Sequence, residues 1–350
     1  MIKYGNVARF FQDIKEEYID CIEKTAQSEI MFNGPFTKEV EERLEKITNR
    51  KALLVTSGSA AMTLVLRHLD IGPRDEVITI NYGPPAVVGP ITFSGAKPVF
   101  VDVDSHGSID CKLLPQALTK NTKAVVAVGL YGDVHDHDLV KRFCDEHKLH
   151  YINDANQSCF AKYKGIDSCC LGDFTTIGFA DNKPIPTLST YGAIMCDTEE
   201  QKLMLNRMRK HGKPYRLEPL TGTGLNAWPD EHRSIQCKLS MDRFDNWQIR
   251  RHEIAKYYYD NLNDTRKSPE YSEWNTHKFV VFFDDKLRAQ RELLDLGIET
   301  VPHYTESYGG TNYKNSMHYV KHALSIPLNP YISDSEAEHI VDMVKKLQDH

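Results

Sequence analysis

The chain has 350 residues, of which 41% are hydrophobic, and its formal net charge is -6 at pH 7. This length accommodates two domains and a large core, and the acidic balance disfavours broad nucleic-acid binding, which requires a basic face. No apolar run approaches the roughly 20 residues of a membrane helix, and the first residues do not resemble a secretory signal. We therefore expect a cytoplasmic protein without nucleic-acid or membrane partners.

Two amphipathic helices are predicted at the N-terminus. Apolar residues recur at helical spacing from Phe10 to Glu29, and Asn33-Gly34-Pro35 then breaks the chain. A second helix is predicted from Thr37 to Thr48, with Thr37 as its N-cap.

A short apolar strand from Lys51 ends in Ser57-Gly58-Ser59, and a strong helix-forming run follows it. The N-terminus of a helix after a glycine turn points backbone N–H groups at one spot, which suits a phosphate. Ser57, Gly58 and Ser59 are therefore a candidate phosphate site. The alternative is that Ser57 or Ser59 only caps the helix.

Further short β-branched runs follow, and helix-like stretches such as Asp138–His147 separate most of them. These strand-like runs begin at Glu76, Lys97, Lys123 and His150. The alternation predicts an α/β domain with a mainly parallel sheet, whose ligands gather at the carboxyl ends of the strands.

Two residues at such strand ends suggest the chemistry of pyridoxal phosphate (PLP). The amine of Lys183 can condense with the cofactor aldehyde, and Asp154 can pair with the protonated pyridine nitrogen so that the ring accepts electrons. A lysine after an apolar run is otherwise a solvated strand end, but Ser57 is predicted at the same edge of the sheet, which favours the cofactor.

The chain changes character after about Met204. Lys213–Pro229 reads as a long loop, and a helix is predicted from Asp230 to Asn261. A smaller domain should then contain a strand from Phe279, a helix at Leu287–Leu296, a strand at Glu299–Pro302 and a closing helix at Asp334–Leu347. We expect a PLP-binding domain with a helical arm over residues 1–230 and a small domain over residues 231–350.

Several stretches resemble the motifs of one family in the correct order. They are Thr56-Ser-Gly-Ser-Ala-Ala-Met62, Gly95-Ala-Lys-Pro-Val-Phe-Val-Asp-Val-Asp104, Asn153-Asp-Ala-Asn-Gln157 (E-D-A-A-Q in the family), Arg209-Lys-His-Gly212 and Leu296-Gly-Ile-Glu-Thr-Val-Pro-His-Tyr304. Together they resemble the DegT/StrS-like family of PLP-dependent sugar aminotransferases. The resemblance implies fold type I: a large domain with a mainly parallel, seven-stranded type of sheet flanked by helices, and a smaller C-terminal α+β domain.

The resemblance also implies site residues. Lys183 would be the Schiff-base lysine, Asp154 the partner of the pyridine nitrogen, and Gln157 a neighbour of the ring's phenolic oxygen. Ser57, Gly58 and Ser59 would hold the phosphate with Asn226 from a second subunit, because the family works as a homodimer with shared active sites.

Some positions depart from the family. The serine of its S-F-x-x-x-K segment is Gly178 here, and the aromatic residue that stacks on the cofactor aligns with Pro84, for which Tyr82 could substitute. The arginine two residues after the partner asparagine aligns with Trp228. By resemblance, Tyr82, Trp228, His303 and Tyr304 are candidate substrate contacts.

The predicted activity is transfer of an amino group from glutamate or glutamine to a keto group of a nucleotide-linked sugar, in amino-sugar biosynthesis. The alternatives are a dehydratase or a transaminase with another acceptor, and a binding or regulatory homologue with little turnover. No metal is predicted, because His135-Asp-His-Asp138 reads as a loop leading into a helix.

Overall fold

The computed structural model describes residues 1–212 and 224–348. Its centre is a seven-stranded sheet with the strand order β1-β9-β8-β5-β4-β2-β3. The strands are β1 (Lys51–Val55), β2 (Glu76–Ile80), β3 (Lys97–Val101), β4 (Thr122–Val128), β5 (His150–Asp154), β8 (Phe174–Phe179) and β9 (Tyr191–Cys196). Only β9 runs antiparallel to its neighbours, β1 and β8. The mainly parallel sheet predicted from the sequence is therefore confirmed.

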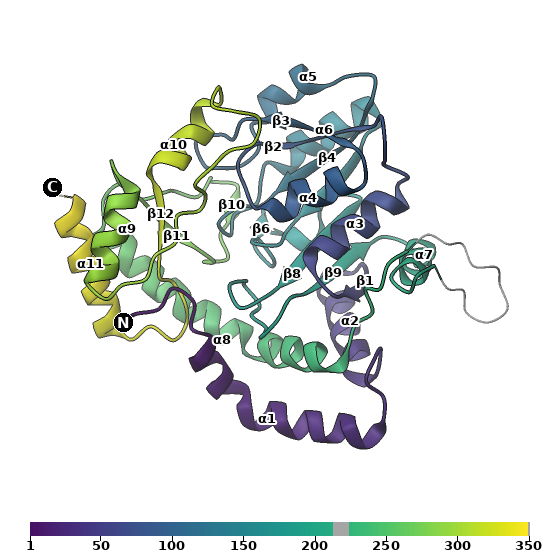
Figure 1. Ribbon diagram of the computed structural model, residues 1–350, viewed down its shortest axis with the longest axis horizontal. Helices are drawn as coiled ribbons and strands as arrows, with labels where there is room; N and C mark the ends of the chain where they lie inside the picture. Colours follow the sequence, from purple (N-terminus) through teal and green to yellow (C-terminus); the bar gives the residue numbers. More distant parts are fainter. Residues whose placement is uncertain (213–223, 349–350) are drawn as a thin grey trace.

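Helices cover both faces of this sheet (Figure 1). Alternate residues of β1 point to opposite faces: Leu53 and Val55 join one apolar cluster, while Ala52 and Leu54 join another. The flanking helices are α3 (Gly58–His68), α4 (Pro85–Phe93), α5 (Leu114–Ala117), α6 (His137–His147) and α7 (Glu199–Met208), with 3₁₀ turns η1 (Cys111–Leu113) and η2 (Ser168–Cys170). A sheet buried on both faces explains why its strands are continuous apolar runs.

The N-terminal arm consists of α1 (Val7–Ser28) and α2 (Pro35–Thr48). The prediction that Thr37 caps the second helix is wrong, since the helix begins at Pro35 with Gly34 as its N-cap. The carboxylate of Glu231, which is fully buried, instead accepts from the backbone N–H groups of Gly34, Phe36 and Thr37. A carboxylate distant in sequence therefore does the capping, and no local pattern signals it.

The long helix α8 (Glu231–Asn261) leads to the C-terminal elements, which lie on the left of Figure 1. They are β11 (Phe279–Phe282), α9 (Lys286–Asp295), α10 (Lys314–His322), β12 (Ala323–Ile326) and α11 (Asp334–Gln348). The predicted strand at Glu299–Pro302 is wrong, because only Val301 bridges to Ser325 there, and α10 was not predicted. The division at residue 230 stays a prediction.

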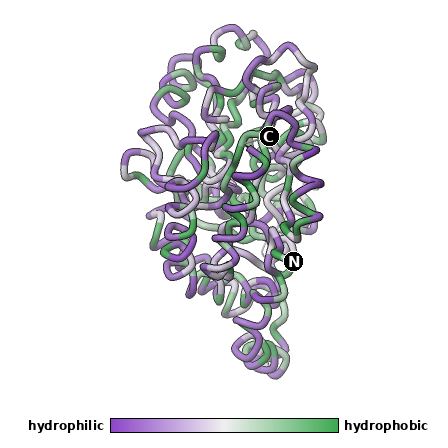
Figure 2. The backbone as a smooth tube through the Cα atoms, turned by 90° about the vertical axis from the view of Figure 1, so that its left-hand side faces the viewer, coloured by the Kyte–Doolittle hydropathy of each residue, from purple (hydrophilic) through white to green (hydrophobic). Residues whose placement is uncertain are grey.

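A small sheet joins the two halves of the chain. It contains β6 (Lys162–Tyr163), β7 (Ile166–Asp167) and β10 (Ser272–Glu273), in the order β10-β6-β7. Figure 2 shows hydrophobic segments running through the interior and hydrophilic ones along much of the periphery. Within residues 1–212 and 224–348, no helix combines the length and apolarity needed to cross a membrane.

Candidate active site

The carboxyl ends of β1, β5 and β8 lie at one edge of the sheet, because these three strands run in the same direction. Asp154 is the last residue of β5, Ser57 follows β1 by two residues, and Lys183 follows β8 by four. The structure therefore brings the three predicted residues to one edge, where ligands of α/β sheets bind.

Asp154 is 1% exposed and has one satisfied and one unsatisfied oxygen. Its Oδ1 accepts from the backbone N (3.0 Å) and side-chain Nδ2 (2.6 Å) of Asn156. Its Oδ2 is buried and has no hydrogen-bond partner among the described residues. Burial raises the pKa of Asp154, and the nearby charge of Lys183 opposes that rise. A buried carboxylate oxygen without a partner suits a protonated ring nitrogen.

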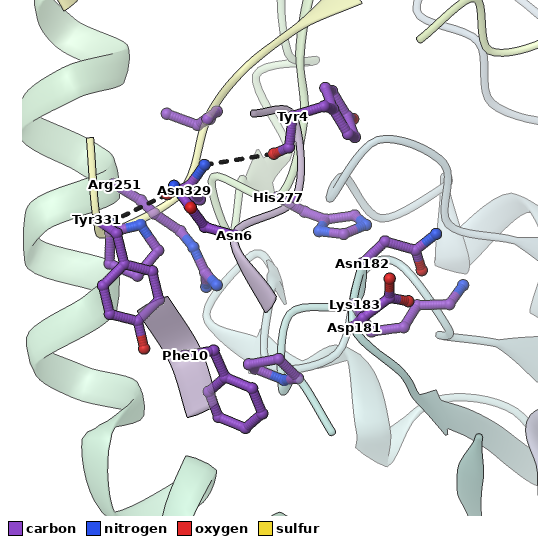
Figure 3. A pocket seen from close by; sticks show the side chains of 14 residues that line it. Tyr4, Asn6, Phe10, Asp181, Asn182, Lys183, Arg251, His277, Asn329 and Tyr331 are labelled. Carbon is purple, nitrogen blue, oxygen red and sulfur yellow. Dashed lines mark hydrogen bonds between the residues drawn. The ribbon is translucent and has the colours of Figure 1, made fainter. Parts of the chain in front are cut away.

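Lys183 lies in the turn after β8, where its backbone N donates to Ala180 O at 3.0 Å. Burial lowers the pKa of the Lys183 amine, against the opposing charges of Asp154 and Asp181. A lowered pKa increases the neutral fraction of the amine, which is the nucleophilic form. Figure 3 shows this side chain at the wall of a cavity, close to His277.

The candidate phosphate site lies at the N-terminus of α3. Ser57 is the N-cap, and its Oγ accepts from Ala60 N at 3.0 Å, so the capping role weighed as an alternative is present. Gly192 approaches closely from β9: a Cβ on it would lie 2.7 Å from Gly58 N. The helix N-terminus still offers free N–H groups to an anion. Phosphate binding by Ser57, Gly58 and Ser59 stays a prediction.

Gln157 and Tyr304 form a hydrogen-bonded pair beside Asp154. Gln157 Nε2 donates to the Tyr304 hydroxyl at 2.8 Å, and Gln157 Oε1 accepts from Tyr131 N at 3.0 Å. Tyr82 is fully buried, and its hydroxyl accepts from Tyr304 N and pairs with the Tyr131 hydroxyl, both at 2.7 Å. Tyr82 therefore positions Tyr304 through a hydrogen bond to its backbone. The direct contact of Tyr82 with substrate or cofactor stays a prediction.

His303 pairs with a buried lysine that the sequence analysis missed. Its Nε2 lies 3.2 Å from Lys278 Nζ, and its Nδ1 lies 3.0 Å from Ser325 Oγ. If the ammonium donates to Nε2, the ring is neutral and its proton is on Nδ1, facing the serine. Lys278 directly precedes an apolar strand, a position that usually holds a solvated lysine, so its burial had no sequence signal.

Asn226 and Trp228 lie apart from these residues. Both are exposed; Asn226 bridges to Lys210, while the Trp228 ring lies 6.1 Å from that of Phe32. Within the described part of the chain, no hydrogen bond joins Asn226 to Ser57, Gly58 or Ser59. The role of Asn226 at the cofactor of a second subunit stays a prediction.

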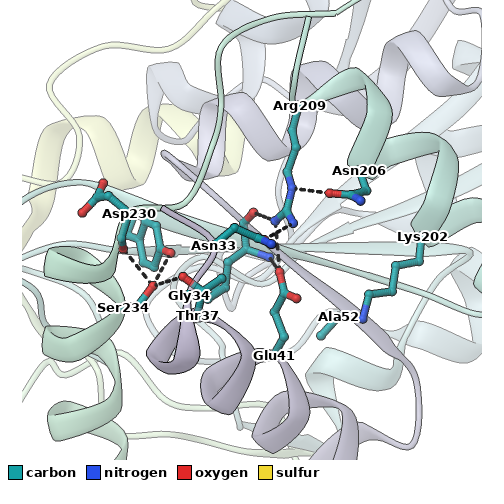
Figure 4. A network of polar contacts seen from close by, with 12 residues as sticks. Asn33, Gly34, Thr37, Glu41, Ala52, Lys202, Asn206, Arg209, Asp230 and Ser234 are labelled. Atoms are coloured by element: carbon teal, nitrogen blue, oxygen red, sulfur yellow. Dashed lines mark hydrogen bonds and ion pairs between the residues drawn. The ribbon is translucent and has the colours of Figure 1, made fainter. Parts of the chain in front are cut away.

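A buried polar network contacts residues 224–229, the segment that contains Asn226 (Figure 4). Arg209, 2% exposed, donates from Nη1 to Glu41 and from Nη2 to Asn33, each at 3.0 Å, and its carbonyl accepts from Ala227 N at 2.9 Å. The network thus connects α2 to the end of α7 and to the residue after Asn226. The predicted loop at Lys213–Pro229 lies outside the described residues except for 224–229, which contain no helix or strand.

No group of three or more His, Cys, Asp or Glu side chains in residues 1–212 and 224–348 is arranged to hold a metal ion. His135 is instead buried, with Nε2 2.5 Å from the Tyr151 hydroxyl, and Asp136 caps α6.

Comparison with known proteins decides the family. Residues 12–345 match the sequence model of the DegT/DnrJ/EryC1/StrS aminotransferase family. The chain belongs to this family. The resemblance predicted from its motifs is therefore confirmed, and the chain is a PLP-dependent aminotransferase.

Individual relatives cover most of the chain. A UDP-2-acetamido-2-deoxy-3-oxo-D-glucuronate aminotransferase of Pseudomonas aeruginosa is 28% identical over 87% of this chain and 86% of its own length. A dTDP-3-amino-3,4,6-trideoxy-alpha-D-glucose transaminase of Streptomyces venezuelae is 27% identical, with 96% and 93% covered.

Solved structures confirm the fold. DesV of S. venezuelae has a TM-score of 0.95 at 24% identity, with 100% of this chain and 99% of that chain covered. NtdA of Bacillus subtilis, solved with the bound cofactor PMP, has a TM-score of 0.92 at 21% identity, covering 100% of this chain and 85% of that one.

The aminotransferase site of this chain fits PLP on its own geometry. Asp154 Oδ2 is a buried acceptor without a partner in residues 1–212 and 224–348, and the charge of Lys183 acts against the rise in the pKa of Asp154 that burial causes. The N-terminus of α3 offers N–H groups at the same sheet edge.

Proposed function

We propose that this aminotransferase moves an amino group from glutamate or glutamine to a keto group of a nucleotide-linked sugar, in amino-sugar biosynthesis in the cytoplasm. The observation that carries the proposal is the arrangement of Lys183 and the unpartnered Asp154 Oδ2 at one sheet edge, in a chain of this family. The relatives named above support a nucleotide-linked sugar as the acceptor.

Bound PLP acts as an electron sink that makes the carbon next to the transferred nitrogen acidic. In our proposal Lys183 holds the cofactor at rest, and its freed amine then moves the proton at the reacting carbon. Asp154 keeps a proton on the ring nitrogen, and its two bonds from Asn156 fix the carboxylate in place. Gln157 is oriented by Tyr131 and Tyr304 and would lie near the phenolic oxygen of the bound cofactor.

We further propose a homodimer with shared sites, in which Ser57, Gly58 and Ser59 bind the phosphate with Asn226 of the other subunit. The exposed rings of Phe32 and Trp228 contact each other two residues from Asn226. They support a subunit interface at this place, because aromatic residues are enriched in protein–protein interfaces. Trp228, His303 and Tyr304 remain candidate substrate contacts.

Two half-reactions test the proposed activity. The aminated enzyme, made by incubation with glutamate, is mixed with keto sugar nucleotides, keto sugar phosphates and cyclic ketones, and return of the PLP absorbance is recorded. We expect a response to keto sugar nucleotides, and none from Lys183→Ala. A response restricted to non-sugar ketones would contradict the sugar acceptor, and release of water with no amination would indicate the dehydratase alternative.

A further inference from the structure

A cavity beside Lys183 is lined by segments that are far apart in the sequence (Figure 3). Tyr4 and Asn6 of the N-terminal segment, Arg251 of α8 and His277 are among the residues that line it. Asn6 Nδ2 donates to Asn329 Oδ1 at 3.3 Å, which fastens the N-terminal segment over the cavity. The cavity is thus lined in part by the N-terminal segment and by the segment that precedes α11.

Two buried basic side chains near this cavity have no acidic partner among the described residues. Arg251 is 5% exposed, and its Nη1 donates to Pro184 O (3.2 Å) and Gln248 Oε1 (3.0 Å). Lys278 is also 5% exposed and pairs only with the His303 ring. Among the described residues, neither has a carboxylate within ion-pair distance. Burial lowers the pKa of Arg251 to about 10 and that of Lys278 well below its ordinary value. Unpaired buried cations are costly and favour an anionic ligand.

His277 provides a second, independent sign of a ligand. It is 8% exposed and lines the cavity, yet its Nε2 has no hydrogen-bond partner among the described residues. His277, Lys183 and Arg251 line the same cavity, and Lys278 directly follows His277 in the chain. Burial, and after it the neighbouring basic groups, lower the pKa of His277 well below its ordinary value. A neutral imidazole ring can present one N–H to an acceptor.

We propose that Arg251 and His277 form a subsite for the carboxylate of the amino donor, with Lys278 beside it as a second basic group whose charged form an anionic ligand would favour. This rests on the proposed function. An amino donor such as glutamate carries its carboxylate on the same carbon as the amine, so that carboxylate must lie close to Lys183. Arg251 contacts Pro184, the residue after Lys183, and a guanidinium matches a carboxylate with two parallel hydrogen bonds. The same subsite could instead bind the carboxylate of a uronic-acid sugar, which has the same hydrogen-bonding groups.

The test measures the two half-reactions separately by the absorbance of bound PLP in single turnovers. Arg251→Met and His277→Phe should each weaken glutamate binding about tenfold or more, because each removes a hydrogen bond to a charged group. Their PLP absorbance should remain, and their affinity for a sugar nucleotide without a carboxylate should change less than about twofold. Arg250→Gln is the matched control, since Arg250 precedes Arg251 on α8 but is paired with Asp334 at 2.6 Å.

A binding measurement without turnover distinguishes this subsite from the proposed function. Glutarate, a dicarboxylate that lacks an amine, should perturb the PLP absorbance of the wild-type enzyme and compete with glutamate. Arg251→Met should weaken glutarate about tenfold or more; if that variant does not fold, Lys278→Met should weaken glutarate instead. Loss confined to uronic-acid sugars would support the subsite with the sugar as its source. Unchanged glutarate, glutamate and uronate binding in the folded variants would overturn it, even if the enzyme aminates sugars as proposed.

Discussion

The side chain of Asn156 occupies the space that any side chain at Gly178 would need. A Cβ placed on Gly178 would overlap Asn156 Oδ1, and the same oxygen excludes a Cβ on Gly58. In the motifs that these segments resemble, E-D-A-A-Q and S-F-x-x-x-K, an alanine stands where this chain has Asn156 and a serine where it has Gly178. The larger residue at one position therefore requires the smaller one at the other. The glycine at position 178 thus compensates for the larger side chain of Asn156. This compensation argues against the catalytically degenerate site that the sequence alone left open.

This coupling predicts a rescue. Gly178→Ser alone should lower the free energy of unfolding by about 1–3 kcal/mol, because overpacking displaces Asn156 and with it Asp154. Adding Asn156→Ala should recover part of that loss, which a double-mutant cycle on the melting of the apoprotein measures. The affinity for PLP, measured by titration, should likewise fall in Gly178→Ser and recover in part when Asn156→Ala is added. Gly89→Ser is the control, since a Cβ on Gly89 meets nothing within 4 Å. Additive effects of the two substitutions would contradict the coupling.

Lys286 predicts a pH dependence of stability. Its Nζ is buried against Tyr304 O at 2.9 Å, and burial lowers its pKa to about 8. Because the unfolded chain holds this proton up to about pH 10.5, the unfolded state binds more protons between these values, and stability rises with pH there. Relative to Lys286→Met, the wild type should gain at most about 1.4 kcal/mol per pH unit between about pH 8 and 10.5.

Urea denaturation of the wild type and of Lys286→Met from pH 7 to 10.5 measures this difference in the free energy of unfolding. Thiols and tyrosines that titrate in the same range contribute equally to both proteins, so their effect cancels in the difference. Lys346→Met, at an exposed position of α11, serves as the control. A constant difference between wild type and Lys286→Met across the range would show that the lysine keeps its ordinary pKa.

The pair Arg209–Glu41 predicts a large loss of stability. Both side chains are buried and 3.0 Å apart, so removing one leaves the other charge uncompensated. Arg209→Met should lower the free energy of unfolding by about 3–5 kcal/mol, whereas Arg209→Met with Glu41→Leu should lose less. Lys141→Met, which breaks the exposed pair with Asp145 on α6, should change stability little. Equal effects of Arg209→Met and Lys141→Met in urea melts would refute a structural role for the buried pair.

Shared sites predict complementation between inactive variants. Lys183→Ala lacks the reactive amine, and the aspartate of Asn226→Asp should repel the cofactor phosphate of the neighbouring site. In a mixed dimer one of the two sites has both residues intact, so activity should partly return after subunit exchange. Recovery is measured in the two half-reactions after unfolding and joint refolding. An active monomer in sedimentation, or no recovery despite proven exchange, would exclude the shared-site dimer.

Local pattern in the sequence was sufficient for the parallel strands of the sheet and for their ends, but it did not indicate the antiparallel strand β9. Buried parallel strands must be apolar and must alternate with helices, so the sequence shows β4, β5 and β8 as short apolar runs. Asp154 and Lys183 stand out as polar residues at or just after the ends of β5 and β8. The motif order then indicated the family. The same reasoning failed at two places. Thr37 is not the N-cap of α2, because the distant carboxylate of Glu231 caps that helix. Residues Glu299–Pro302 form no strand, because only Val301 bridges to a neighbouring strand.

Only the tertiary structure decided what surrounds Lys183. Arg251 is one of two adjacent arginines in α8, and only packing shows that Arg251 turns inward while Arg250 pairs with Asp334 at the surface. Lys278 and His277 become functional candidates through burial, which residue type alone does not reveal. The coupling of Asn156 with Gly178 joins positions 22 residues apart through contact in space. Sequence pattern thus determined which backbone elements form, because their periodicity is local, while charge burial and close packing depend on chain segments that meet only in the folded protein.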